Sequence, residues 1–253
     1  MQLNYKTFGK GDPVIILHGL FGTLDNWQTI GKKLAEDYMV FLVDQRNHGR
    51  SPHFSEHSYS LMADDLRTFM ESEWLHQAYL IGHSMGGKTA MQFALDYPEM
   101  VEKLVVVDIG PNQNKSNHQA VFDAFYSVDV DLINSRNEAA DLMAKKIDDP
   151  EVLQFLLKNL SRRKEGGFRW KMNLEALERN YSAILANVEG EDNYPGETLF
   201  IKGGKSDYLQ ESDLKEIRQQ FPIAEMVTIP RAGHWVHAEA PNELLELLEL
   251  FLK

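Results

Sequence analysis

Short runs of apolar and β-branched residues alternate with amphipathic stretches over the first 110 positions of the chain. This alternation is typical of βαβ units, which build a parallel sheet. The apolar runs contain no alternating polar positions, as expected for strands that helices cover on both faces. The runs predict strands at Val14–Leu17, Val40–Val43, Ala78–Ile81 and Leu104–Val107, a further strand within 1–10, and helices at Trp27–Tyr38, Ser60–Trp74 and Ser84–Tyr97.

The strand pattern is absent between Pro111 and Tyr194, and helical periodicity replaces it. Helices are predicted there at Ala120–Val128, Glu138–Ile147, Glu151–Leu160 and Trp170–Asn187. Sheet pattern then returns, with strands at Thr198–Ile201 and Glu225–Ile229 and helices at Ser212–Gln220 and Pro241–Leu252. We therefore predict an α/β core formed by 1–110 and 195–253, with a helical cap of 111–194 inserted after the strand that ends at Asp108.

Length and composition agree with this organisation. The chain has 253 residues, and a single core stops growing near this length. The hydrophobic fraction of 43% and the charged fraction of 25% are those of an ordinary soluble globular protein, which excludes a disordered or fibrous chain. The absence of cysteine excludes disulfides, thiolate metal sites and a cysteine nucleophile.

Charge and hydropathy restrict the partners. The net charge of −12 repels phosphate backbones and anionic lipid surfaces, so neither nucleic acid nor a membrane is an expected partner. The first ten residues lack a basic segment followed by an apolar one, and no apolar stretch approaches about 18 residues. The expectation is a cytoplasmic, unanchored protein; its oligomeric state is not readable from the sequence.

A candidate nucleophile lies in Gly82-His83-Ser84-Met85-Gly86, between the strand ending at Ile81 and the helix beginning at Ser84. Gly-x-Ser-x-Gly in this strand, turn and helix context forms a sharp elbow that presents the serine hydroxyl at the top of the sheet. Glycine is needed on both sides because a Cβ there would collide with neighbouring backbone. The pattern indicates nucleophilic catalysis by Ser84.

A serine hydroxyl needs a general base, and a third group must hold that base in the right tautomer. Among nine histidines, His234 follows the last predicted strand, at the edge where such sheets build their sites. His83, beside the nucleophile, is interpreted as a packing or hydrogen-bonding residue, and His237 as a surface or core residue. Two carboxylates satisfy the third role equally well on sequence grounds, Asp108 after one strand and Asp207 after the next.

The segment His18-Gly19-Leu20-Phe21 follows the strand Val14–Leu17 and supplies a turn of the main chain. The N–H groups of Leu20 and Met85 are the predicted donors of an oxyanion hole. The polar loop Asp44–Ser51 is not accompanied by an acidic cluster with the spacing of metal ligands, and His53 and His57 lack the partners that a zinc site needs. No metal or cofactor is expected.

Taken together, the order Ser84, an aspartate, then His234, with His18-Gly19 and the loop Asp44–Ser51, resembles the α/β-hydrolase superfamily over essentially the whole chain. More narrowly, the stretches His18–Gly22, Gly82–Lys88, Val107–Pro111 and Gly233–Glu239 are similar to the subgroup of the bacterial esterase YbfF and its mitochondrial abhydrolase relatives. The resemblance implies a compact helical cap, esterase or thioesterase activity and no cofactor. It favours Asp108 as the acid and adds Ser206 as a fourth member near the histidine; Asp207 remains the alternative.

The motifs and the resemblance together predict a serine hydrolase that cleaves carboxylic esters or thioesters with short to medium acyl chains through an acyl-enzyme. Carbon–carbon hydrolases and cofactor-free haloperoxidases use the same triad and stay open as alternatives, as does a silent ligand-binding module. Substrate contacts are predicted at Phe21 and Trp235 in the quoted motifs. Within the insertion, Phe125 and Trp170 are predicted to contact substrate as well. The aromatic residues of the insertion as a group either line an acyl pocket or form the cap core: Phe122, Phe125, Tyr126, Phe155, Phe168, Trp170 and Tyr181.

One charge cluster departs from the acidic background. Between Lys158 and Lys171, six cationic side chains face a single carboxylate, Glu165. Such an island attracts anions locally despite an unfavourable overall field. It is either a solvated cap loop around Gly166-Gly167 or a receiver for a charged leaving group, such as the phosphates of an acyl-CoA thioester.

Overall fold

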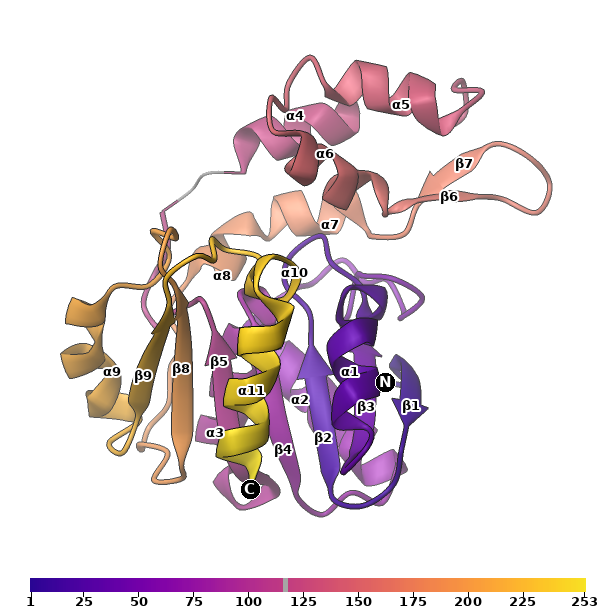
Figure 1. Cartoon of the computed structure of the whole chain (residues 1–253). Coiled ribbons are helices and arrows are strands. Elements are labelled where there is room, and N and C mark those ends of the chain that lie inside the picture. Colours follow the sequence, from indigo (N-terminus) through magenta and orange to yellow (C-terminus); the bar gives the residue numbers. More distant parts are fainter. Residues whose placement is uncertain (116–117) are drawn as a thin grey trace.

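A seven-stranded sheet forms the centre of the computed structural model, which describes residues 1–115 and 118–253 (Figure 1). The strands follow one another across the sheet in the order β1-β3-β2-β4-β5-β8-β9. Their bounds are β1 Asn4–Phe8, β2 Pro13–Leu17, β3 Met39–Asp44, β4 Ala78–His83, β5 Val101–Val107, β8 Thr198–Gly203 and β9 Glu225–Ile229. Every predicted strand of the core is present, and β1 is the one that pairs antiparallel, with β3.

Helices cover both faces of the sheet, which explains the continuous apolar runs of its strands. Ile15 and Leu17 of β2 belong to one apolar cluster, which contains side chains of α2, α3 and α9. Val14 and Ile16 point to the opposite face, into a cluster with side chains of α1 and α11. The helices are α1 Gln28–Leu34, α2 Tyr59–Ser72, α3 Met85–Asp96, α9 Leu214–Gln220, α10 Val236–Glu239 and α11 Pro241–Leu252, with short 3-10 turns η1 Leu24–Trp27, η2 Pro98–Met100 and η3 Glu211–Asp213.

The segment between β5 and β8 folds over one end of the sheet (Figure 1). It contains α4 Gln119–Tyr126, α5 Arg136–Met143, α6 Pro150–Leu157, β6 Leu160–Arg162, β7 Phe168–Trp170, α7 Leu174–Arg179 and α8 Tyr181–Leu185. Its apolar side chains form a third cluster, to which Phe21, Tyr59, Met62 and Met85 of the core contribute. This insertion therefore packs directly on the part of the core that carries Ser84.

The prediction that the insertion is purely helical is wrong at 160–170. Here β6 and β7 pair antiparallel, with Leu160 opposite Trp170, and the hairpin projects beyond the core (Figure 1). Gly166 and Gly167 make the turn with φ of +100° and +75°, a backbone region that residues other than glycine rarely adopt. Strands of three residues are too short to show a period in the sequence.

The helix predicted over Trp170–Asn187 is also wrong, because three features interrupt it. Trp170 ends β7, and α7 begins only at Leu174, where the Asn173 side chain accepts a hydrogen bond from the Ala176 N–H. Asn180 then separates α7 from α8. Asparagine competes with helical hydrogen bonding through its own side chain, which suits both positions.

A buried lysine of α3 ties the insertion to the core. Lys88 Nζ donates to the carbonyl oxygens of Asn112 and Ala186, each at 2.6 Å, and these residues lie near the two ends of the inserted segment. Burial lowers the pKa of Lys88 to about 7. One side chain thus holds both connections next to the elbow.

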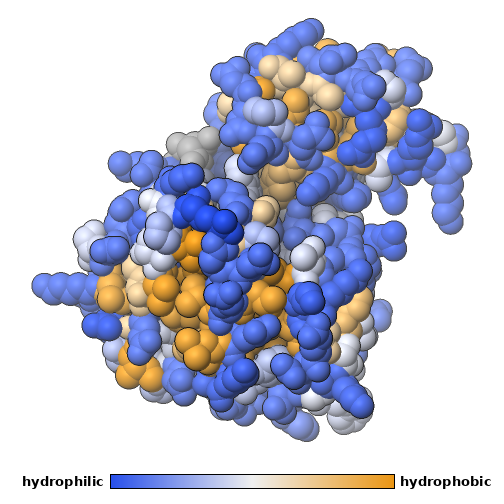
Figure 2. All heavy atoms as spheres, in the orientation of Figure 1, coloured by the Kyte–Doolittle hydropathy of each residue, from blue (hydrophilic) through white to orange (hydrophobic). Residues whose placement is uncertain are grey.

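The surface of the protein is mainly hydrophilic, with an apolar area on the core over α11 and the neighbouring sheet (Figure 2). Leu250 of α11 is 75% exposed. Among the described residues, no helix is both long and apolar enough to cross a membrane.

Candidate active site

The turn between β4 and α3 places Ser84 in strained backbone geometry. Its φ of 53° and ψ of −120° lie outside the regions that a serine ordinarily adopts. A Cβ at Gly82 would come within 2.2 Å of the Gly86 carbonyl oxygen, and one at Gly86 within 2.4 Å of the Leu17 carbonyl oxygen. Both glycines are therefore required by close backbone approach, and the Ser84 N–H donates to the Val107 carbonyl oxygen at 3.1 Å.

The loop after β9 brings His234 to this serine. His234 Nε2 lies 3.0 Å from Ser84 Oγ, and the opposite ring nitrogen, Nδ1, lies 2.7 Å from Asp108 Oδ2. The N–H groups on either side, of Gly233 and Trp235, donate to the Glu239 carboxylate at 2.7 and 3.1 Å. Glu239 on α10 therefore fixes the loop from which the imidazole projects.

The carboxylate that contacts His234 belongs to Asp108. It follows β5 with a φ of 53° and is fully buried, yet its oxygens have partners. Oδ1 accepts from the Gly203 N–H at 2.8 Å, and Oδ2 accepts from the Ser206 hydroxyl as well as from His234 Nδ1. These donors compensate the desolvation of a buried charge.

The alternative acid, Asp207, is exposed, whereas its neighbour Ser206 is buried against Asp108. The structure thus brings Ser84, His234, Asp108 and Ser206 together and leaves Asp207 outside the group. Sequence position alone left the two aspartates equivalent, because both follow strands of the same sheet edge.

The two residues predicted to form the oxyanion hole lie next to Ser84: Leu20 lines the same cavity, and Met85 follows it in the chain. Met85 is the first residue of α3, and Leu20 lies in a tight turn closed by the Gly22 N–H donating to the Gly19 carbonyl oxygen at 2.9 Å. Within the described part of the chain, neither the Leu20 nor the Met85 N–H donates to another protein atom. Both are thus available to a bound oxygen, and the positive end of the α3 dipole adds to the Met85 position.

A model of the alpha/beta hydrolase fold family matches residues 12–241 of this chain. The chain belongs to this family. It is 39% identical to the sn-1-specific diacylglycerol lipase ABHD11 of Danio rerio, over 100% of this chain and 83% of that protein. It is 35% identical to esterase YbfF of Escherichia coli, over 96% and 94% of the two chains.

Among solved structures, a marine microorganism esterase superposes on this α/β hydrolase with a TM-score of 0.97 at 41% identity, and 99% of each chain is covered. The family and fold indicated by the sequence motifs are thereby confirmed. The relatives named here are called esterases and lipases.

The α/β hydrolase has a cavity of about 220 Å³ at Ser84, between core and cap. Phe21 and Trp235, predicted to contact substrate, both line it. Phe125 and Trp170 do not: their rings pack against each other with centroids 4.9 Å apart, and Phe125 lies behind Phe21 at 5.2 Å. The prediction for these two residues is corrected, because they lie behind Phe21, outside the lining of the Ser84 cavity, and line a different pocket of the cap.

An outer pocket of about 430 Å³ continues from the Ser84 cavity. The two share Asn26, Phe155, Trp235 and His237. The rings of Phe155 on α6 and Trp235 on the core loop lie 5.6 Å apart at this junction. The Ser84 cavity therefore joins the outer pocket between one cap aromatic and one core aromatic.

Three residues that sequence reasoning did not assign to the site surround His234. The Tyr208 ring stacks on the imidazole at 4.0 Å, and His83 Nε2 lies 2.8 Å from the His234 carbonyl oxygen. His118, at the start of α4, lines the cavity with its Nδ1 2.6 Å from the Tyr181 hydroxyl. Burial lowers the pKa of His83 well below its ordinary value and that of His118 to about 4, so both are neutral at pH 7.

Only His83 carried a sequence signal for such a place, because it lies inside the elbow motif. Nothing in the sequence around Tyr208 or His118 marks either one. His237 stacks on Trp27 at 4.7 Å, as expected of a packing residue.

The polar loop after β3 serves the architecture of the site. The Asp44 carboxylate accepts hydrogen bonds from the N–H groups of Leu24 and Arg50 and from the Asn4 side chain. His18 Nε2 accepts from the Gln45 N–H at 3.1 Å, which joins this loop to the turn that carries Leu20. Within the described residues, no group of three or more His, Asp or Glu side chains is placed to hold a metal ion.

Proposed function

We propose that this α/β hydrolase is a serine esterase that cleaves carboxylic esters through an acyl-enzyme on Ser84. The observation that carries the proposal is the continuous chain from Ser84 Oγ to His234 Nε2 at 3.0 Å and from His234 Nδ1 to Asp108 Oδ2 at 2.7 Å, beside a cavity. The names of relatives that match nearly the whole chain also support it.

In the first half of the reaction, Ser84 Oγ attacks the ester carbonyl carbon while His234 Nε2 takes the hydroxyl proton. The carbonyl oxygen becomes an oxyanion, which accepts hydrogen bonds from the Leu20 and Met85 N–H groups. The bond to the leaving oxygen then breaks, and His234 returns the proton to the departing alcohol. The acyl group remains on Ser84.

In the second half, water replaces the alcohol. His234 Nε2 takes a proton from water as its oxygen attacks the acyl carbon, and the collapse of the second tetrahedral intermediate returns that proton to Ser84 Oγ. Asp108 holds the imidazole with Nε2 free to accept and stabilises the imidazolium formed in each half. Ser206 and the Gly203 N–H position Asp108 through their hydrogen bonds to its carboxylate.

The size of the cavity favours short to medium acyl chains. Its volume of about 220 Å³ lies below the range of roughly 300–1,000 Å³ typical of drug-sized ligands. Its apolar lining comes from Phe21, Val121, Val152 and Leu156. We propose that the acyl group lies among these side chains and that the leaving group extends past Phe155 and Trp235 into the outer pocket.

Thioesters, including acyl-CoA, belong to this proposal because the outer pocket carries one cation of the basic segment, Lys158. The same segment's Arg162, Arg163, Arg169 and Lys171 line a different pocket, which shares no residue with the Ser84 cavity. We therefore assign the reception of a phosphorylated leaving group to Lys158 rather than to the arginines.

The test compares p-nitrophenyl butyrate with butyryl-CoA in the parent, Ser84→Ala and Lys158→Gln. Loss of both activities in Ser84→Ala supports the esterase assignment, and residual turnover at the parental rate would overturn it. Lys158→Gln should lower kcat/KM for butyryl-CoA only, with the exposed cap residue Lys145→Gln as the control. An equal response of the two substrates to Lys158→Gln would remove acyl-CoA from the proposal.

A further inference from the structure

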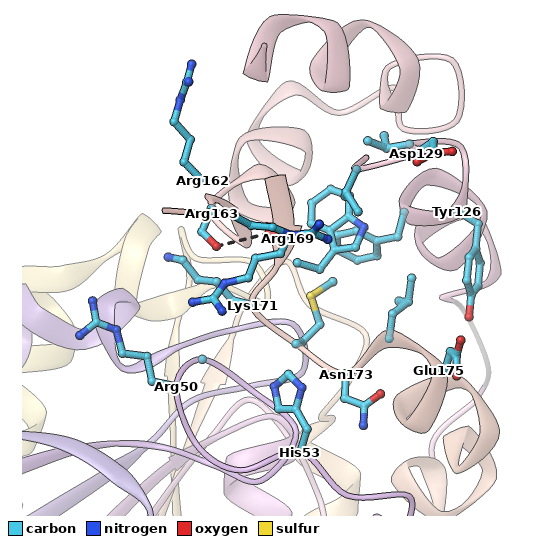
Figure 3. Close-up of a pocket in the computed structure, with 18 of the residues that line it drawn as sticks. Arg50, His53, Tyr126, Asp129, Arg162, Arg163, Arg169, Lys171, Asn173 and Glu175 are labelled. Atoms are coloured by element: carbon cyan, nitrogen blue, oxygen red, sulfur yellow. Dashed lines mark hydrogen bonds between the residues drawn. The ribbon is translucent and has the colours of Figure 1, made fainter. Parts of the chain in front are cut away.

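A second and larger pocket lies where the cap hairpin meets the core. Its volume is about 930 Å³, and its walls come from the core loop around Arg50, from β6 and β7, and from the start of α7 (Figure 3). It shares no lining residue with the Ser84 cavity. Phe21 lines the cavity and Phe125 lines this pocket, and their rings are 5.2 Å apart, so an aromatic wall separates the two spaces.

The pocket concentrates positive charge in an acidic protein. Five cationic side chains line it against two carboxylates, those of Asp129 and Glu175, although the whole chain carries −12. In Figure 3, Arg50, Arg169 and Lys171 lie on one side of the pocket above His53, whereas Glu175 and Tyr126 lie on the other. Charges of opposite sign are thus separated across the pocket.

Two of the five cationic side chains already interact with other residues of the protein. Arg163 is paired with Asp131 at 2.7 Å, and the Arg162 guanidinium stacks over the Phe168 ring and points away from the others (Figure 3). Within the described residues, no carboxylate lies within ion-pair distance of Arg50, Arg169 or Lys171. Three cations therefore line one side of the pocket without a direct ion pair, and Asp25 is the carboxylate near enough to Lys171 for its pKa to be lowered by it.

The remaining wall is apolar and aromatic. Trp170 is half-buried and held edge-to-face by Phe125 at 4.9 Å, and Val128, Met172 and Leu174 continue the surface. Guanidinium groups bind phosphate oxygens in pairs, and aromatic side chains accept flat rings. The combination suits a ligand with two or more phosphate charges at one end and a flat or apolar body at the other.

We propose that this pocket is a separate binding site for a phosphorylated small molecule of the nucleoside diphosphate type. Arg50, Arg169 and Lys171 hold the phosphates, and the body of the ligand lies against Trp170. Because β7 and the chain after it carry most of these residues, an occupied pocket ties the hairpin to the core loop 49–53. Binding is independent of acyl transfer at Ser84.

The test measures binding by calorimetry with three probes: ADP, inorganic pyrophosphate and adenosine. ADP should bind the tightest, pyrophosphate more weakly, and adenosine not detectably. Arg169→Gln/Lys171→Gln should weaken ADP binding at least about tenfold, since each charged hydrogen bond contributes substantially. Higher salt should weaken it further in the parent. Turnover of p-nitrophenyl butyrate should be retained, which also shows that the variant is folded.

The matched control is Lys145→Gln/Lys146→Gln, which removes the same charge from exposed cap positions outside the pocket. ADP binding should be parental in this control. An equal loss in both variants would overturn the proposal in favour of general charge attraction. Absence of saturable ADP and pyrophosphate binding would overturn it directly. Loss of ADP binding after a phosphonate is attached to Ser84 would also overturn it, because the two sites would then be one.

Discussion

Acidification should destabilise this fold well above the pH at which its carboxylates titrate, because several histidines are buried in the neutral form. Burial lowers the pKa of His57 and of His237 to about 3 and that of His118 to about 4. His57 Nε2 and His237 Nδ1 have no hydrogen-bond partner among the described residues. A proton added at either buried nitrogen would be a charge without a hydrogen-bond partner.

The sign follows from linkage. In the unfolded chain a histidine has a pKa of about 6.5. Below this pH the unfolded state binds protons that the buried histidines of the folded state do not bind, so the free energy of unfolding decreases as the pH falls. Between pH 7 and pH 5.5 each of the three histidines lowers the free energy of unfolding by about 1.3 kcal/mol, and the three together lower it by about 4 kcal/mol. This decrease is a large part of the free energy of unfolding of a typical domain, which is about 5 to 15 kcal/mol.

The assay is urea unfolding at pH 7 and pH 5.5, followed by the fluorescence of the four tryptophans. The variant His57→Gln removes one titrating group distant from Ser84, so the loss between the two pH values should shrink by about 1.3 kcal/mol whatever its absolute stability. His76→Gln, at an exposed position, is the control and should behave like the parent. Equal stability of the parent at the two pH values would refute the reasoning.

The other predictions concern the site and its turn. Ser84→Ala and His234→Ala should each abolish esterase turnover, and the double variant should be no slower than either, because the pair acts as one unit; additive losses would contradict this. Asp108→Asn should lower kcat by at least about a hundredfold through the wrong imidazole tautomer, whereas the exposed Asp207→Asn should change it little; the reverse ranking would exchange the two roles. Gly82→Ala should lower the free energy of unfolding, measured with urea, by about 3 kcal/mol, because the new Cβ would lie 2.2 Å from backbone. Gly167→Ala should lower it by about 1 kcal/mol, because φ is positive there but the space is open. Equal losses would show that the elbow tolerates a side chain.

The sheet is predictable from the sequence because burial of both its faces requires strands that are apolar throughout. Strands such as β2 and β5 are apolar on both faces, and only a sheet between two helical layers requires that pattern. The sequence does not predict the hairpin β6–β7, because each of its strands has three residues and its glycine turn resembles any polar loop. Its positive φ values become visible only in the structure.

Local motifs predict the residues proposed here as nucleophile and base, but they do not distinguish between the two candidate acids. Asp108 and Asp207 both follow strands at the same edge of the sheet, and their difference arises from the backbone after each strand. Asp108 takes a positive φ and stays buried, whereas the turn after β8 directs Ser206 inward and leaves Asp207 exposed. Such orientation depends on packing from distant segments.

The assignment of aromatic residues failed for a similar reason. Phe125 and Trp170 were predicted from residue type, which suits a substrate pocket and a cap core equally. The fold places Phe21 of the core between them and the Ser84 cavity. Long-range packing, which a single sequence does not display, decides which aromatic residues face a ligand.

The most direct test of the proposed chemistry is the covalent reaction of the protein with a p-nitrophenyl alkylphosphonate, followed by mass spectrometry of the intact chain and its peptides. Attack by Ser84 Oγ on phosphorus should release one p-nitrophenolate per chain and leave one phosphonyl group on the peptide that contains Ser84. Labelling should be absent in Ser84→Ala and much slower in His234→Ala. An unlabelled chain, or a label on any other residue, would contradict the account.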